Sequence, residues 1–128
     1  MESIEPRLIT DHQVNPVNDL IRIEVLDDPG EGGANHEYRV VVNDSLPEHR
    51  RACRIFFHNG LIGVKGVNGI TQEVLIAICI DRLRSFQAGP YACRENALAL
   101  TKLEEAQMWL LSRTRARMAR NVEGTHTV

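Results

Sequence analysis

The stretch ACRENALALTKLEEAQMWLLSRTRARMAR, residues 92–120, decides the fold of this chain. It contains neither Gly nor Pro, and most of its residues are good helix formers. Gly89 and Pro90 precede it and Gly124 follows it, so helix-breaking residues stand at both ends. The stretch therefore predicts one helix of about 28 residues and about 42 Å, which needs a long surface to lie on.

This predicted helix combines a core-facing stripe with a basic end. Arg113, Arg117 and Arg120 recur at i, i+4 and i+7 and share one helix face, whereas Arg115 points elsewhere. Unpaired guanidinium groups on one face favour a compensating anion, and they bind phosphate through two parallel hydrogen bonds. The alternative is a solvated helix end, where cations are favoured in any case. The expected stripe comprises Ala97, Leu100, Leu103, Gln107, Leu110 or Leu111, and Thr114, extended by Met108 and Trp109.

A second, shorter helix is predicted just before it. Thr71 can cap a helix that runs from about Gln72 to Ser85 or Phe86. Its segment VLIAICI, residues 74–80, is apolar on every side, and such a helix must be covered all round. A sheet and one neighbouring helix cover two sides, which leaves a side for another copy of the chain. A short apolar run is also compatible with a buried strand.

The loop at residues 87–90 reverses the chain, so the two helices form an antiparallel hairpin over residues 68–120. The first half reads as strands, because apolar and polar residues alternate over residues 20–26 and 36–42. We expect a turn at 27–35, a connector at 43–51, a third strand at 54–58, and a return strand at 61–67. The dipeptide Asn59-Gly60 suits the type I′ turn between the last two.

The expected fold class is therefore α+β, with a small antiparallel sheet of about four strands followed by a long antiparallel helical hairpin. We expect a single domain over residues 1–128. Its parts are a loosely held polar arm at 1–18, a sheet region at 19–67, the hairpin at 68–120 and a fraying polar tail at 121–128.

Composition excludes several classes of protein. Hydrophobic residues make up 43% and charged residues 25% of the chain, which is typical of a soluble globular protein. The net charge of -2 argues against binding to a nucleic acid polymer. The three cysteines form no CxxC pair, so we expect buried reduced thiols. The N-terminus lacks a signal pattern, and the longest apolar run is far shorter than the roughly 20 residues that span a membrane.

Enzyme signatures are absent from the sequence. There is no GxSxG, no P-loop and no HExxH, and the five histidines lack metal-ligand spacing. Glu104 and Glu105 point about 100° apart on a helix, so we expect solvated charges, or partners for Lys102 and nearby arginines, rather than acid–base work. We therefore expect no enzymatic activity, no cofactor and no metal site. Taken alone, Phe86 fits a core residue and Asn96 fits a surface or capping residue.

The run from NGIT at residues 68–71, through FQAGPYACRENALAL at 86–100, to WLLSRT at 109–114 resembles a helical-hairpin family of phage proteins. These are sponge proteins that disarm the Thoeris and CBASS bacterial immune systems by sequestering cyclic nucleotide signals. The preceding strands resemble the Thoeris-directed branch. The resemblance implies that the ligand is a cyclic ADP-ribose isomer, held uncleaved between two protomers in the cytoplasm of the infected bacterial host.

The resemblance also implies which residues bind the ligand. An aromatic residue at the end of the first helix matches Phe86, an Asn early in the second matches Asn96, and two arginines one heptad apart match Arg113 and Arg120. Phe86 would stack on adenine, Asn96 would hydrogen-bond the base or ribose, and the arginines would clamp the pyrophosphate. Further candidates of lower rank are Thr114, Arg117, Arg84, Thr101 and Thr125.

Two other functions stay open at this point. One is a sponge for CBASS cyclic di- or trinucleotides, alone or in additional pockets. The other is a small phage protein that binds nucleic acid through its arginines, which predicts affinity that falls steeply with salt. The family implies a homo-oligomer, either a dimer or a hexamer built as a trimer of dimers. Since Asn96 and Arg113 are separated by about 26 Å along one helix, an antiparallel partner helix is expected to complete the site.

Overall fold

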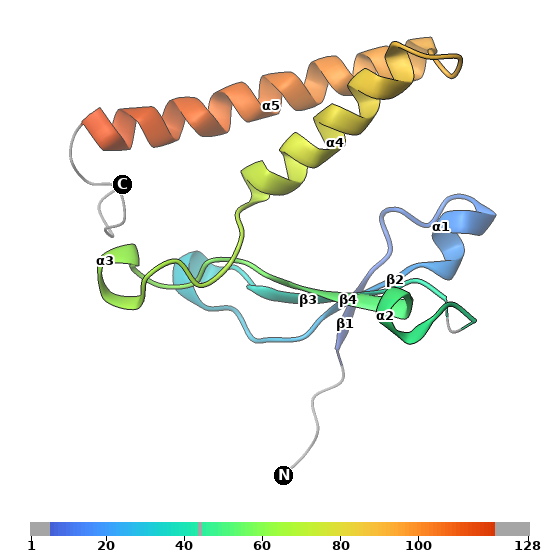
Figure 1. Cartoon of the computed structure of the whole chain (residues 1–128). Coiled ribbons are helices and arrows are strands. Elements are labelled where there is room, and N and C mark those ends of the chain that lie inside the picture. Colours follow the sequence, from blue (N-terminus) through green and yellow to red (C-terminus); the bar gives the residue numbers. More distant parts are fainter. Residues whose placement is uncertain (1–5, 44, 120–128) are drawn as a thin grey trace. The chain divides into compact units, whose positions relative to one another are not determined.

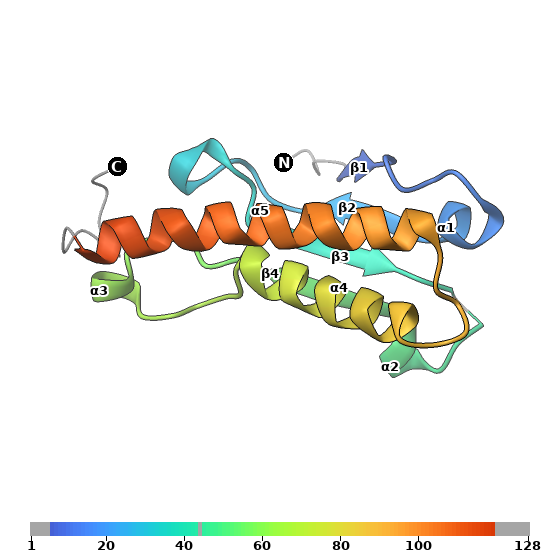
Figure 2. The ribbon, with the colours of Figure 1, turned by 90° about the horizontal axis from the view of Figure 1, so that it is seen from above.

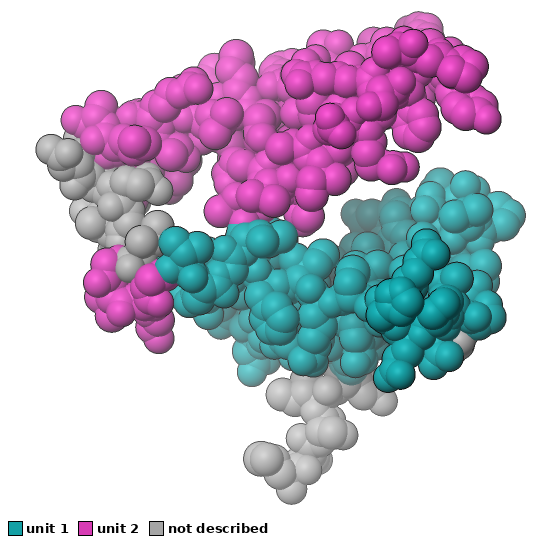
Figure 3. Space-filling model, in the orientation of Figure 1, with its two compact units in different colours: residues 1–60, 67–70 teal, residues 61–66, 71–128 magenta. Residues whose placement is uncertain are grey.

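The computed structural model describes residues 6–43 and 45–119 and forms two compact units (Figure 3). The sheet unit comprises residues 1–60 and 67–70, and the hairpin unit comprises residues 61–66 and 71–128. The predicted α+β class is confirmed, with four antiparallel strands followed by two long helices (Figure 1). The elements are β1 (Arg7–Ile9), α1 (Pro16–Leu20), β2 (Arg22–Val25), the 3-10 turn η1 (Glu31–Gly33), β3 (Glu37–Val41), α2 (Glu48–Arg51), β4 (Ala52–Phe56), α3 (Ile62–Lys65), α4 (Gln72–Gln87) and α5 (Arg94–Ala119).

The sheet is an antiparallel meander in the order β1-β2-β3-β4. One cross-strand row carries charge, because Glu24 lies opposite Arg39 and Arg39 lies opposite Arg54. Glu24 is 7% exposed and forms ion pairs with Arg39 at 2.5 Å and with Arg22 at 3.5 Å. The hydrogen bond from Arg39 lowers the pKa of Glu24 and outweighs the opposing effect of burial. A charged side chain can therefore be buried on this face because it is paired.

The opposite face of the sheet holds the apolar core of this unit. Val25 is 4% exposed and lies opposite Tyr38, which in turn lies opposite Ile55. The ring of Phe57 meets the edge of Tyr38 at a centroid distance of 5.6 Å. Alternation along the strands thus separates an ion-paired face from an apolar face, as the period of two predicts.

Asp27 fixes the connection between β2 and β3. Its carboxylate accepts hydrogen bonds from the backbone N–H groups of His36 at 2.9 Å and Glu37 at 3.2 Å. The side chain of Asn35 donates to the backbone oxygen of Asp27 at 2.7 Å. Burial raises the pKa of Asp27, but these hydrogen bonds together bring that pKa below its ordinary value. The predicted turn at 27–35 is therefore held from its first residue.

The identity of the fourth strand was wrong in the sequence-based prediction. The segment at 61–67, expected to be a return strand, instead contains the short helix α3, and Asn59-Gly60 does not join two strands. The fourth strand is β1, which comes from the segment expected to be a loose arm and pairs with β2. The same segment contains the start of α1, capped by the side chain of Asn15, and the connector at 43–51 contains α2. Three-residue strands and single helical turns leave too short a pattern in the sequence to be recognised.

Asn59 and Asn68 are hydrogen-bonded to each other at the base of the loop that contains α3. We call this paired segment, which replaces the expected turn, the neck. The backbone N–H of Asn59 donates to the side chain of Asn68 at 2.8 Å, and the side chain of Asn68 donates to the backbone oxygen of Asn59 at 2.7 Å. The backbone N–H of Asn68 also donates to Nδ1 of His58 at 3.2 Å. Gly69 lies so close to the end of β4 that a Cβ there would be 2.5 Å from the backbone oxygen of Phe56. These contacts hold the chain that leads into α4.

The predicted helical hairpin is confirmed, with α4 and α5 side by side and joined at one end by a short loop (Figure 2). Thr71 caps α4, since its hydroxyl accepts the N–H of Val74 at 3.4 Å. The side chain of Gln107 in α5 donates to the backbone oxygen of Glu73 in α4 at 3.0 Å. Ile80 is the most buried apolar residue of this unit among those described, at 6% exposed. The half-buried residues of α5 include Leu100, Leu103, Ala106, Gln107, Leu110, Leu111 and Thr114.

Several side chains expected in the core are exposed instead. Met108 is 51% exposed and Trp109 is 64% exposed, and Ala97 also faces solvent. On α4, Val74 is 44% exposed and Ile78 is 52% exposed, so its apolar circumference is covered only in part. The three cysteines, Cys53, Cys79 and Cys93, are exposed rather than buried. Composition indicated how apolar the hairpin is but not which of its faces a single chain covers.

No helix within the described residues has both the length and the apolar character needed to cross a membrane.

Candidate functional site

The loop end of the hairpin is held by hydrogen bonds between the end of α4 and the start of α5. The side-chain oxygen of Gln87 accepts the backbone N–H of Cys93 at 3.0 Å. The sulfur of Cys93 lies 3.5 Å from the backbone N–H of Asn96 and caps the first turn of α5. The backbone N–H of Ala88 donates to Arg84 and closes α4. The hydrogen bond between Gln87 and Cys93 thus joins the chain next to Phe86 to the chain just before Asn96.

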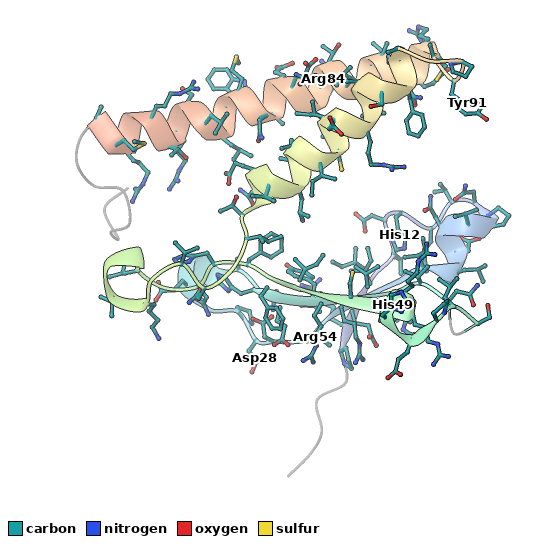
Figure 4. All side chains as sticks on the ribbon, viewed as in Figure 1. His12, Asp28, His49, Arg54, Arg84 and Tyr91 are labelled. Carbon is teal, nitrogen blue, oxygen red and sulfur yellow. The ribbon has the colours of Figure 1, made fainter. Side chains whose placement is uncertain are left out.

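Phe86 is half-buried and lies between two other side chains. The guanidinium carbon of Arg82, one helical turn earlier, is 5.5 Å from the centroid of the Phe86 ring. Tyr91, in the loop, meets the Phe86 ring edge-on at a centroid distance of 6.4 Å and an angle of 68°. Tyr91 is 73% exposed and lies at the loop end of the hairpin (Figure 4). Neither Arg82 nor Tyr91 was among the binding residues predicted from the sequence, although the spacing of four residues between Arg82 and Phe86 places these two on one helix face.

Asn96 is half-buried in the first turn of α5. Within residues 6–43 and 45–119, the structure gives its side-chain amide no hydrogen bond, so both its donor and its acceptor are available to a ligand. An amide of this kind can read the edge of an adenine base or bind a ribose hydroxyl. Phe86 and Asn96 therefore offer an aromatic surface and an unengaged amide at one end of the hairpin.

The arginines lie toward the other end of α5. Arg113 is exposed, whereas Arg117, one turn further on, is only 6% exposed. The hydroxyl of Thr114 donates to the backbone oxygen of Leu110 at 3.2 Å, so it is satisfied within the helix. Arg120 and Thr125 lie outside the described residues. Because α5 is continuous from Arg94 to Ala119, Asn96 and Arg113 are about 26 Å apart along its axis.

Two of the lower-ranked candidates already have partners. Arg84 forms an ion pair with Glu104 at 2.8 Å, and the hydroxyl of Thr101 donates to the backbone oxygen of Ala97 at 3.1 Å. Glu105 lies 3.9 Å from Lys102, so of the two expected roles for the adjacent glutamates, solvated charges or ion-pair partners, the structure shows the second. These contacts tie up Arg84 and Thr101 on the hairpin itself.

The sheet unit has hollows of its own. One of about 360 Å³ is lined by residues that include Arg7, Asp27 and Asn35. Asn35 accepts a hydrogen bond from Arg7 at 3.0 Å and donates to Asp27, so these polar groups are occupied with one another. None of the binding residues predicted from the sequence lines this hollow. The predicted binding residues that the structure describes all lie on the hairpin.

Comparison with known proteins also identifies a hairpin domain in this chain. Residues 48–115 match the model of the family described as "Acb2/Tad1, hairpin domain", which covers more than half of the 128-residue chain. The chain is also 45% identical over 97 residues to "Thoeris anti-defense 1" of Bacillus phage SBSphiJ7. That alignment covers 76% of this chain and 65% of the relative, so the chain spans less than two thirds of the relative's length. The chain therefore belongs to the Acb2/Tad1 hairpin-domain family.

Proposed function

We propose that this protein is a phage anti-defence protein that sequesters the cyclic ADP-ribose signal of Thoeris immunity without cleaving it. The observation that carries the proposal is the 45% identity to a phage protein named Thoeris anti-defense 1. The geometry of the hairpin supports it, since the Gln87–Cys93 hydrogen bond keeps the end of α4 and the start of α5 together near Phe86 and Asn96. The proposed location is the cytoplasm of the infected host, where such a signal acts.

The chemistry of the proposed pocket favours retention over cleavage. Phe86 stacks on adenine, a contact worth about 1–3 kcal/mol by analogy with bases on aromatic side chains. Asn96 hydrogen-bonds the base or ribose, and Arg113 with Arg120 binds the pyrophosphate through charge-assisted bonds. Phenyl, amide and guanidinium groups are neither nucleophiles nor general bases at neutral pH. Such a set binds a ligand and leaves its bonds intact.

The proposed pocket is shared by two copies of the chain. Asn96 and Arg113 are about 26 Å apart on one continuous helix, which is too far for one small ligand to touch both. Two antiparallel copies of α5 bring Arg113 of one protomer beside Phe86 and Asn96 of the other. The exposed apolar side chains of the hairpin, including Ile78, Met108 and Trp109, supply surface for such an assembly. The assembly is a dimer, or a hexamer built from three dimers.

Recovery of the bound molecule tests sequestration directly. The purified protein is incubated with the products of an active Thoeris enzyme, washed by gel filtration, heated to unfold it, and the released material is analysed by mass spectrometry. We expect the cyclic ADP-ribose isomer to be released with unchanged mass. Recovery of ADP-ribose or another hydrolysed product in its place shows an enzyme and contradicts the proposal, and so does failure to retain the signal.

A second candidate is a sponge for cyclic di- or trinucleotides, alone or in additional pockets. The matched family model joins Acb2 with Tad1, and the resemblance seen in the sequence includes sponges directed at CBASS. Calorimetry with cyclic di- and triadenylate distinguishes the candidates. Binding of these ligands after the cyclic ADP-ribose sites are saturated indicates a separate pocket. Binding that competes with cyclic ADP-ribose indicates one shared pocket.

A further inference from the structure

The two arginines of α4, Arg82 and Arg84, differ in their partners. Arg84 is paired with Glu104 at 2.8 Å. Among residues 6–43 and 45–119, Arg82 has neither an ion pair nor a hydrogen bond, and its recorded contact is the one with the ring of Phe86 at 5.5 Å. Its guanidinium donors are therefore unengaged at the ring that is proposed to carry the ligand's base.

We propose that Arg82 is a further binding residue of the Phe86 site, which takes a phosphate oxygen of the nucleotide whose base stacks on Phe86. This inference rests on the proposed function and adds a residue that neither the sequence motif nor the family comparison assigns. A guanidinium can stack on an aromatic face and still direct its N–H groups outward in the plane of the group. In a nucleotide the ribose joins the base to the phosphate, so one ligand can stack its base on Phe86 and direct a phosphate oxygen to Arg82.

The surroundings of Arg82 favour an anion. Neither Phe86 nor Tyr91 carries a negative charge. The Tyr91 ring contacts the Phe86 ring in an edge-on arrangement, with 6.4 Å between the ring centroids. The nearest carboxylate in the sequence is that of Asp81. Its side chain points away from that of Arg82, because successive residues on a helix are rotated by about 100°. The charge of Arg82 thus stays uncompensated in this part of the described chain, and a phosphate supplies the missing anion through charge-assisted hydrogen bonds.

Arg82→Gln and Lys102→Gln form a matched pair for testing this role. Each variant removes one positive charge from an exposed position of the hairpin, and Lys102 lies outside the proposed pocket. The dissociation constant for the purified cyclic ADP-ribose isomer is measured by calorimetry at two salt concentrations. We expect Arg82→Gln to weaken binding by about 10- to 100-fold, as for a lost hydrogen bond to a charged group, and to reduce the salt dependence of binding. Lys102→Gln should change affinity less than about threefold.

A readout in the free protein separates direct contact from a merely structural role. If Arg82 only orients Phe86, Arg82→Gln also shifts the ring-proton resonances of Tyr91 without ligand, and the salt dependence stays that of the unaltered protein; this result overturns the proposal. Affinity equal to that of Lys102→Gln overturns it too, while the proposed function stands. If the unaltered protein does not bind the isomer, both the proposed function and the proposed role of Arg82 are contradicted. Weaker, less salt-dependent binding with unshifted Tyr91 resonances supports the proposal.

Discussion

The side-chain oxygen of Gln87 accepts a hydrogen bond from the backbone N–H of Cys93 at 3.0 Å, and this contact joins the last residue of α4 to the residue before α5. Phe86 lies one residue before this contact, and Asn96 lies three residues after it. The two helices that carry the predicted base-binding residues are therefore fixed at their shared end by more than the loop alone. This local constraint reduces the entropy that ligand binding has to overcome.

Replacement of Gln87 by Ala tests this constraint. We expect Gln87→Ala to lower the free energy of unfolding of the hairpin by about 1 kcal/mol, because one hydrogen bond is lost and the N–H of Cys93 is left to water. Chemical unfolding followed by the helical circular dichroism signal measures the change. Gln72→Ala, at the exposed first residue of α4, is the matched control. Equal stability of the two variants would show that the Gln87 contact does not hold the hairpin.

The neck before α4 makes a sharp steric prediction. A Cβ at Gly69 would lie 2.5 Å from backbone atoms of Phe56 and Phe57, and neither can move without disturbing the end of β4. We expect Gly69→Ala to lower the free energy of unfolding of the sheet by about 2 kcal/mol or more, as overpacking against backbone does. Gly63→Ala should change it little, since no atom lies within 4 Å of a Cβ there. Similar effects of the two variants in chemical unfolding would contradict the observed close approach.

Acid should weaken the sheet through Glu24. Its pKa is lowered from 4.5 in the folded chain by Arg39, so the stabilisation is complete above that value and is lost as pH falls through the lower folded pKa. The pKa of Asp27 is lowered from 3.8 and adds a loss of the same sign at lower pH. We expect the stability of the unaltered protein to fall as the pH drops below about 4.5, and Glu24→Gln to flatten that dependence.

The amide resonances of β2 and β3, followed during chemical unfolding at several pH values, measure this change for the sheet alone. Glu105→Gln serves as the control, since its carboxylate is exposed and lies 3.9 Å from Lys102. If Glu24→Gln and the unaltered protein lose stability in parallel as the pH falls, the Glu24–Arg39 pair is not the source of the acid sensitivity.

The sequence predicted the hairpin well because each of its boundaries has a physical signal. Thr71 caps α4 as expected, and Gly89 with Pro90 ends the helical pattern before α5. The alternation around Glu24 and Tyr38 likewise predicted the central strands. The short elements escaped prediction because β1 has three residues and is defined by its pairing with β2, which no local pattern shows.

The candidate site was predictable in part. The family motif pointed to Phe86 and Asn96, and the structure places both beside the loop of the hairpin. The motif did not include Arg82. Its spacing of four residues from Phe86 places the two on one helix face, and the folded helix shows the guanidinium over the ring of Phe86. The exposure of Trp109 and Met108 was also hidden from sequence, since a hydrophobic residue has the same signature whether its own chain or a second copy covers it.

The claim that two copies of the long helix share one pocket is tested most directly by mixing two inactive variants. Phe86→Ala and Arg113→Ala chains are co-expressed with different tags and purified through both, and retention of the cyclic ADP-ribose isomer is measured by mass spectrometry. Neither variant alone should retain it. A mixed dimer should retain about half of the amount held by the unaltered protein, because its two-fold interface contains one intact pocket. A mixed hexamer also contains pairs of like variants, so it should retain less than half but still a measurable amount. A mixed oligomer that retains none, while the unaltered protein retains the isomer, would place the whole site within a single chain and contradict the shared pocket.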